Sequence, residues 1–253
     1  MKYLVPLLFL VLLSACHTAQ PWQVASVERT RLVVDSRYDA GIPLEAQQFL
    51  APYARQVDSI SCPIVGFTKH TLRRAQPESE LSNLLADIMV WAGKQYGEQP
   101  DLGVYNMGGI RASLPAGDVS YGNVVDVAPF DNRISFSTLT GADLLDLFRQ
   151  IAARGGEGVS HGVALEITAD GQLLSARLNG KEIEAAALYR VATIDYLAAG
   201  NDGLVAFRKK TNFRIPDGEG TEARYIITEY LRTEMAAGRP VERPVEGRIR
   251  VVR

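Results

Sequence analysis

Residues 101–133 hold the side chains of this chain whose types and order best suit ligand binding. An apolar stretch runs into Asn106, the pair Gly108-Gly109 and Arg111, and Phe130 follows further along. Glycines let a backbone approach a ligand closely, an asparagine amide both donates and accepts, and a guanidinium fits a carboxylate or phosphate. The same residues also suit a plain turn beside a solvated arginine, so their types alone leave both interpretations open.

Two aromatic residues and one acid suit recognition of a flat ring and a sugar. Phe130 follows Pro129, and Tyr196 precedes a glycine-bounded loop that contains Asp202. Two aromatic faces can hold a base between them, at roughly 1–3 kcal/mol for each stacked base. Asp202 could accept hydrogen bonds from sugar hydroxyls or form an Asx turn, and either ring could belong to the core.

The sequence lacks the common motifs of metal and nucleophile chemistry. The three histidines, His17, His70 and His161, lie far apart. The chain has no His-Glu-x-x-His, no Cys-x-x-Cys, no Gly-x-Ser-x-Gly and no phosphate-binding or dinucleotide-binding glycine loop. His161 lies in "EGVSHGVAL", where a single histidine favours a structural or solvated role. The sequence therefore predicts no metal site and no catalytic residue in this chain.

Composition and charge are typical of a globular protein with a substantial core. The chain has 253 residues, of which 47% are hydrophobic and 22% charged, with a formal net charge of −2 and a pI of about 6.0. A nucleic-acid-binding protein usually shows a basic face and a high pI, so this balance argues against that class.

The N-terminal residues have the pattern of an export signal. Lys2 precedes an apolar run shorter than the ~20 residues that span a bilayer. The tetrapeptide Leu13-Ser14-Ala15-Cys16 resembles the bacterial lipobox, which predicts a signal peptide over residues 1–15, a lipid on Cys16 and a tether over 16–27. The alternative is ordinary cleavage after a small residue. With lipidation, the domain is expected to be membrane-anchored and to face the periplasm, and Cys62 is expected to be a buried small apolar residue.

Hydrophobic periodicity predicts a mixture of strands and helices over residues 28–253, which we interpret as one domain. Thr140 is expected to cap a helix, and Asp170-Gly171 and Asn179-Gly180 are expected to form turns. The fold class is therefore α/β (α+β), a mixed β-sheet with packed helices. The predicted strands lie in 30–36, 61–69, 101–105, 132–140, 163–183 (two strands) and 189–197, and the predicted helices in 43–60, 79–97, 141–154 and 221–238.

Three blocks together resemble the C-terminal domain of the bacterial and animal 5′-nucleotidases. They are "ESELSNLLADIM", then "YNMGGIRASLPAGDVSYGNVVDVAPFDNRISFSTLTGADLLDLF", then "YRVATIDYLAAGNDGLVAF", and the likeness covers roughly residues 60 to 250. The resemblance implies a domain that binds the nucleoside part of a nucleotide. It implies the following roles: Phe130 and Tyr196 clamp the base, Asn106 and Gly108 line the base edge and sugar, Arg111 reaches toward the sugar and phosphate, and Asp202 accepts from the ribose hydroxyls.

The chain departs from the family's pattern at four positions. Met107 stands where glycine is usual, and it would be strained if that position required a positive φ. Pro77 stands where an arginine commonly precedes the helix, although Arg73 and Arg74 lie close by. Asn201 replaces a glycine, which asparagine tolerates because it adopts the left-handed region more readily than most residues. Tyr196 stands where phenylalanine is common.

The family's enzymes also carry an N-terminal metallophosphatase domain, in which a metal-activated water attacks the phosphate. No segment of this sequence resembles that domain. The first hypothesis is therefore that the chain is the nucleoside- or nucleotide-binding subunit of a split 5′-nucleotidase, with divalent metal ions only on a separate metallophosphatase chain and no cofactor here. A second is a stand-alone nucleoside- or nucleotide-binding lipoprotein without catalysis. A third is a remnant with an inactive pocket.

Overall fold

The computed structural model describes residues 22–252 and divides the chain into two units, Met1–Leu50 and Ala51–Arg253. In the first unit, the described residues form the 3-10 helix η1 (Ser36–Gly41) and the start of helix α2 (Leu44–Ser61), and residues 22–34 have no regular structure. The strand expected in 30–36 is wrong. Its apolar residues Leu32 and Val34 are exposed, so alternation there does not correspond to a buried face. The predicted signal peptide and Cys16 lie outside the described residues.

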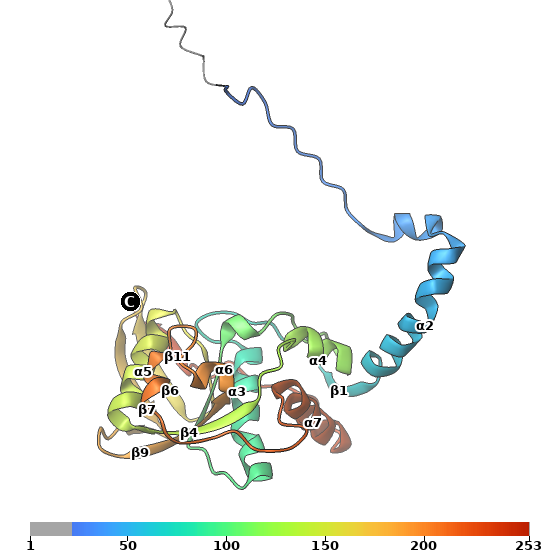
Figure 1. The fold of residues 1–253 in the computed structure, drawn as a ribbon. Coiled ribbons are helices and arrows are strands. Elements are labelled where there is room, and N and C mark those ends of the chain that lie inside the picture. The colour runs from blue at the N-terminus through green and yellow to red at the C-terminus, as the bar shows by residue number, and fades with distance from the viewer. Residues whose placement is uncertain (1–21, 253) are drawn as a thin grey trace, which may run out of the picture. The chain divides into compact units, whose positions relative to one another are not determined.

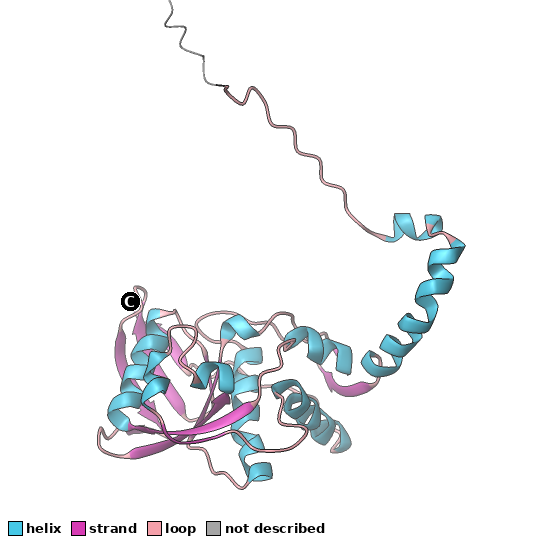
Figure 2. Cartoon of the chain, viewed as in Figure 1, coloured by secondary structure: helices cyan, strands magenta, loops and turns pink. Residues whose placement is uncertain are grey.

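The second unit contains three β-sheets with helices packed on them (Figures 1 and 2). The largest sheet has the order β10-β4-β9-β2-β5, in which β2 pairs parallel with β9 and the other pairs are antiparallel. The predicted class, α/β (α+β) with a mixed sheet, is therefore confirmed. The strands are β2 (Leu102–Tyr105), β4 (Ile134–Thr140), β5 (Gly158–Val159), β9 (Leu188–Ile194) and β10 (Thr211–Arg214).

Two smaller sheets complete the strand arrangement. One has the order β11-β6-β7-β8, with β11 parallel to β6, and the other pairs β1 with β3. Asn179 and Gly180, with φ of 51° and 76°, make the predicted turn of the β7–β8 hairpin, because both central positions of such a turn need a positive φ. The strands are β1 (Ile64–Thr68), β3 (Gly117–Ser120), β6 (Val163–Thr168), β7 (Leu173–Leu178), β8 (Lys181–Glu182) and β11 (Ile249–Val252).

Two of the longer helices begin at a residue whose side chain accepts from a free backbone N–H group. Thr140 accepts from the Asp143 N–H at the start of α5 (Gly141–Ala153), as predicted, and Ser79 does the same with Ser82 at the start of α3 (Glu80–Ala92). Helix α3 packs on β2 and lies beside α7 (Ala223–Ala236) (Figure 1). The other helices are α4 (Tyr121–Val127), α6 (Asp195–Ala198), η2 (Gly93–Tyr96), η3 (Met107–Gly109) and η4 (Val205–Lys209). Within residues 22–252, no helix is long and apolar enough to cross a membrane.

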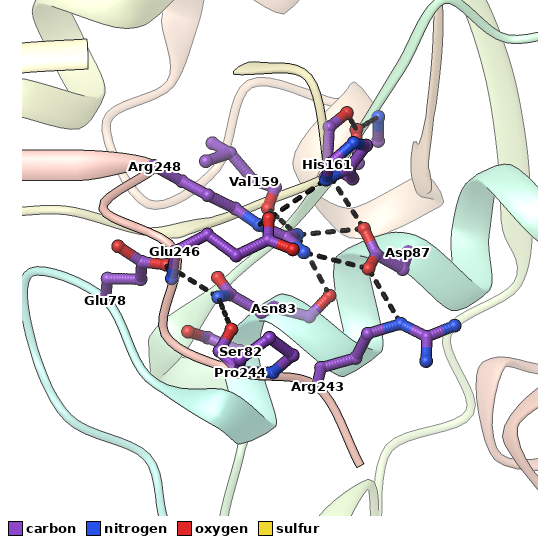
Figure 3. Close-up of polar contacts among 12 residues, drawn as sticks. Glu78, Ser82, Asn83, Asp87, Val159, His161, Arg243, Pro244, Glu246 and Arg248 are labelled. Carbon is purple, nitrogen blue, oxygen red and sulfur yellow. Dashed lines mark hydrogen bonds and ion pairs between the residues drawn. The ribbon is translucent and has the colours of Figure 1, made fainter. Parts of the chain in front are cut away.

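A network of charged side chains joins the C-terminal strand to α3 (Figure 3). The Arg248 side chain is 2% exposed and donates from Nη1 and Nη2 to the two carboxylate oxygens of Asp87, at 2.8 and 3.0 Å. Its Nη1 also donates to the Val159 carbonyl at 2.8 Å, and its Nε donates to Glu246 at 2.8 Å. Arg248 immediately precedes β11, so this guanidinium connects β11, β5 and α3 around one buried charge.

Candidate functional site

All six residues singled out from the sequence line one cavity of about 370 Å³ in the second unit. They come from three places in the chain: the segment that follows β2, the loop after α4, and α6 with the loop behind it. The fold therefore brings together residues separated by almost a hundred positions. The residues that line the cavity are Asn106, Gly108, Gly109, Arg111, Phe130, Asn132, Tyr196 and Asp202.

The two aromatic residues of this cavity are on the surface and not in the core. Phe130 is 46% exposed and Tyr196 is 39% exposed, whereas Phe136 and Phe148 are fully buried. The backbone of Tyr196 is held on both sides, because its N–H donates to Asp195 Oδ1 at 2.8 Å and its carbonyl accepts from Asn201 Nδ2 at 2.9 Å. Exposed rings in a cavity can stack on a flat ligand, which core rings cannot do.

Asp202 links the polar residues of the cavity. Its Oδ2 accepts from Asn106 Nδ2 and its Oδ1 accepts from the Tyr196 hydroxyl, both at 2.9 Å. The hydrogen bond to Asp202 raises the pKa of Tyr196, so the phenol stays protonated and continues to donate. Tyrosine in place of the family's phenylalanine therefore adds a link between the aromatic wall and the acid.

The Asn106 amide is held in one orientation beside the cavity. Because Nδ2 donates to a carboxylate, the orientation of the amide is fixed and Oδ1 points the other way. Among the described residues Oδ1 has no hydrogen-bond partner, although it is buried. A Cβ at Gly109 would lie 2.5 Å from this oxygen, so glycine is needed there. Asn106 Oδ1 is therefore enclosed beside Gly109, away from the surface of the cavity.

Met107 fits its loop without the strain that the sequence suggested. It begins η3 with its side chain buried, and the non-glycine residues with positive φ in the described chain are Asn179, Asp202 and Asn212. In the loop after α6, the non-glycine residue with positive φ is therefore Asp202, at 53°, and not Asn201 as expected. Asn201 instead uses its side chain to hold the carbonyl of Tyr196.

Comparison with known proteins identifies the family. A sequence model described as "5′-nucleotidase, C-terminal domain" matches residues 64–209, which is more than half of the chain. The chain belongs to the 5′-nucleotidase C-terminal domain family. This 5′-nucleotidase C-terminal domain is 31% identical over 145 residues to Protein UshA of Escherichia coli, and 26% identical over 228 residues to the trifunctional nucleotide phosphoesterase protein YfkN of Bacillus subtilis.

The solved structures give the same fold. The 5′-nucleotidase precursor from Thermus thermophilus is 26% identical, with a TM-score of 0.70 over 82% of this chain and 43% of that chain. Sulfate thiohydrolase SoxB from the same organism, at 15% identity and a TM-score of 0.62, shares the fold. The matched parts cover 56% and 82% of this chain but 25% of UshA and 15% of YfkN, so the 5′-nucleotidase C-terminal domain spans a quarter or less of these relatives.

Two charged residues beside the cavity of this 5′-nucleotidase C-terminal domain were missed from the sequence. Arg154, the C-cap of α5, donates from Nε to Glu157 Oε1 at 2.6 Å, and its Nη2 lies 3.8 Å from Asp202 Oδ2. Glu157 is fully buried and accepts a hydrogen bond from the Met107 N–H. Burial raises the pKa of Glu157, against the opposing effect of Arg154. The signal that could have identified the pair is an acid between glycines in "RGGEG".

Predictions were also made from the sequence for Cys62 and His161. Cys62 is exposed, which contradicts the expected burial, because it directly follows α2, in which no described residue is buried. His161 is exposed and its Nδ1 lies 3.0 Å from Glu246 Oε2, which agrees with the predicted structural or solvated role. In the part of the chain that the structure describes, no three or more His, Cys, Asp or Glu side chains are placed to hold a metal ion.

Proposed function

We propose that this chain is the nucleoside- or nucleotide-binding specificity subunit of a split periplasmic 5′-nucleotidase, which acts with a separate metallophosphatase chain. The observation that carries the proposal is one cavity that is lined by two exposed aromatic rings, a hydrogen-bonded acid and an asparagine. Because the chain belongs to the 5′-nucleotidase C-terminal domain family, a nucleotide is the ligand class that best fits this combination of stacking and polar groups.

Each cavity residue has a role in binding under this proposal. Phe130 and Tyr196 stack on the base, and Asn106 and Gly108 line the edge of the base and the sugar. Asp202 accepts from the sugar hydroxyls with the lone pairs that Asn106 and Tyr196 leave free. Arg111, which is exposed and bonds to the Gly108 carbonyl at 3.3 Å, is placed for the sugar and phosphate. Metal ions on the partner chain would supply the activated water.

The test of the split enzyme is a reconstitution. The full chain is mixed with each metallophosphatase encoded in the same genome, and phosphate release from AMP is measured with each protein alone and with the mixture. We expect one mixture to hydrolyse AMP faster than the sum of its parts. Nucleoside binding by calorimetry without stimulation of any such phosphatase would instead favour the alternative, a stand-alone nucleoside- or nucleotide-binding lipoprotein.

The proposal also includes a lipid anchor on Cys16 that leaves the domain facing the periplasm. It is motivated by the lipobox-like Leu13-Ser14-Ala15-Cys16 and by residues 22–34, which are exposed, have no regular structure and could act as a tether. We expect radiolabelled palmitate to be incorporated into the protein in a bacterial host and to be lost in Cys16→Ser. Label that persists in Cys16→Ser would contradict the anchor, and Cys62→Ser, which keeps Cys16, is the matched control.

A further inference from the structure

We propose that the Tyr196 hydroxyl is a positioning group that makes the cavity select a sugar with two neighbouring hydroxyls, as in ribose. The inference rests on the proposed function, because it assigns the sugar specificity of the same nucleoside cavity. Its basis is the hydrogen bond that the Tyr196 hydroxyl donates to Asp202 Oδ1 at 2.9 Å. Phenylalanine would offer the same stacking face without this bond, so stacking does not account for the hydroxyl.

The Asp202 carboxylate is held at both of its oxygens by donors from different parts of the chain. Asn106 Nδ2, directly after β2, donates to Oδ2 at 2.9 Å, and Tyr196, on α6, donates to Oδ1. A carboxylate with a single donor can still turn about its Cβ–Cγ bond, because that torsion is broad. A second donor on the other oxygen restricts this rotation. The Tyr196 hydroxyl therefore fixes the plane of the carboxylate.

The acceptor sites that remain on Asp202 match a pair of neighbouring hydroxyls. A carboxylate has about four lone-pair sites, so each oxygen keeps about one after these two bonds. The Asp202 side chain is 21% exposed and lines the cavity, so a ligand has access to it. The 2′- and 3′-hydroxyls of ribose can each donate to one oxygen. A deoxyribose that lacks either hydroxyl leaves one acceptor unpaired, which costs affinity.

The neighbours of the carboxylate leave these sites uncovered. Arg154 Nη2 lies 3.8 Å from Asp202 Oδ2, beyond hydrogen-bond distance, and Arg154 donates from Nε to Glu157 instead. Gly108 has no side chain, whereas a Cβ there would stand 3.6 Å from Oδ2. Glycine at this position therefore keeps one side of the carboxylate open to the cavity.

The Tyr196 hydroxyl reaches Asp202 from a backbone that is itself held in place. The Tyr196 N–H donates to Asp195 Oδ1 at 2.8 Å, and its carbonyl accepts from Asn201 Nδ2 at 2.9 Å. Asn201 immediately precedes Asp202, so two side-chain hydrogen bonds close the loop between Tyr196 and Asp202. The donor and the acid are thus ordered before a ligand arrives, which lowers the entropy lost on binding.

Titration calorimetry on the full chain in detergent tests the proposal with adenosine, 2′-deoxyadenosine and 3′-deoxyadenosine. We expect the unaltered protein to bind adenosine about tenfold more tightly than either deoxynucleoside, because each of these lacks one hydrogen bond to a charged acceptor. Tyr196→Phe should reduce this ratio to about threefold or less by weakening adenosine binding. Its affinity for the deoxynucleosides should change little, because the ring remains and a carboxylate that turns can still accept from one hydroxyl.

A control variant and a double-mutant cycle separate positioning from other effects. Tyr225→Phe removes the hydroxyl of a 42% exposed tyrosine outside the cavity and should leave the ratio unchanged. Asp202→Asn tolerates the φ of 53° but replaces an acceptor with a donor, so it should weaken adenosine binding. Adding Tyr196→Phe to Asp202→Asn should then weaken it no further. A second loss as large as in Tyr196→Phe alone would show that the hydroxyl acts independently of Asp202, which overturns the positioning role.

The remaining outcomes also decide. A ratio that is unchanged or higher in Tyr196→Phe overturns the proposal, because the hydroxyl would then have no effect on the sugar or would compete with it. Equal weakening of all three nucleosides also overturns it, because the hydroxyl would then only place the ring. If the unaltered protein binds all three equally well, the sugar specificity is wrong while the nucleoside site stands. If it binds none of them, the proposed function fails and the specificity fails with it.

Discussion

The variant Asp87→Ala should lose about 3 kcal/mol of unfolding free energy, toward the lower end of the 3–5 kcal/mol that removal of one partner of a buried ion pair costs. The side chain of Arg248 is 2% exposed and bonds to both Asp87 oxygens. Alanine would leave this guanidinium in place with only Glu246 and backbone carbonyls as partners. The remaining carboxylate of Glu246 is the reason to expect the lower end of the range.

The loss of stability in Asp87→Ala should extend beyond the Arg248 pair, because Asp87 accepts hydrogen bonds from several elements. Asp87 Oδ1 also accepts from the His161 N–H at 2.7 Å, and Oδ2 accepts from Arg243 Nε at 3.1 Å. These contacts connect α3 to the turn after β5 and to the segment before β11 (Figure 3). Removing the carboxylate therefore loosens the C-terminal strand as well, and amide protection in β11 should fall in hydrogen exchange.

Urea unfolding followed by circular dichroism measures the effect. The control is Asp146→Ala, which removes a helical carboxylate whose partners, Arg149 and Lys209, are both exposed on the surface. Exposed pairs contribute about 0–1 kcal/mol, so this variant should stay close to the unaltered protein. Equal midpoints for Asp87→Ala and Asp146→Ala would show that the Arg248 network does not stabilise the fold.

Elements specified by local sequence were predicted well. The apolar spacing and the Thr140 cap predict α5 to within a residue of its observed end, and the Asn179-Gly180 pair predicts the β7–β8 turn. In both cases, the residues that set the structure lie within a few positions of one another. Local patterns of this kind are readable because i, i+3 and i+4 contacts and turn φ angles need no distant partner.

Elements that depend on distant contacts were missed or wrong. Strand β11 pairs with β6, which lies more than seventy residues earlier, and Arg248 pairs with Asp87 across an even longer separation. Neither pairing has a local signal. The strand expected in 30–36 shows the converse error, because alternating apolar residues predict a strand only where a second strand is available to pair with them.

The candidate site likewise contains residues that were predicted from the sequence and residues that were missed. The six residues predicted from motifs and resemblance all line one cavity, but their binding roles stay predictions. Arg154 and Glu157 were missed although Glu157 lies between glycines, because their place beside the cavity depends on how the end of α5 meets the segment around Pro77.

The variant Phe130→Ala should weaken nucleoside binding by about tenfold or more, because one of two stacking faces is lost at roughly 1–3 kcal/mol for each base. Phe130 is 46% exposed without a ligand, so the protein already leaves this ring uncovered and available. The substitution removes no buried side chain and should leave the melting temperature close to that of the unaltered protein. Calorimetry with adenosine and cytidine measures the loss, which should affect both because stacking tolerates any base.

The chain offers a matched control for the stacking interpretation. Phe213 on β10 has the same 46% exposure but is not among the residues of the cavity, and Lys210 Nζ lies 4.7 Å from its ring centre. Phe213→Ala should leave the affinity unchanged, and Phe130→Tyr should keep most of it because the ring face remains. If Phe130→Leu binds as tightly as Phe130→Tyr, the side chain contributes apolar area only, and the aromatic clamp is wrong. A loss of affinity in Phe130→Ala and Phe130→Leu, with affinity retained in Phe130→Tyr, would establish that the site requires a planar ring.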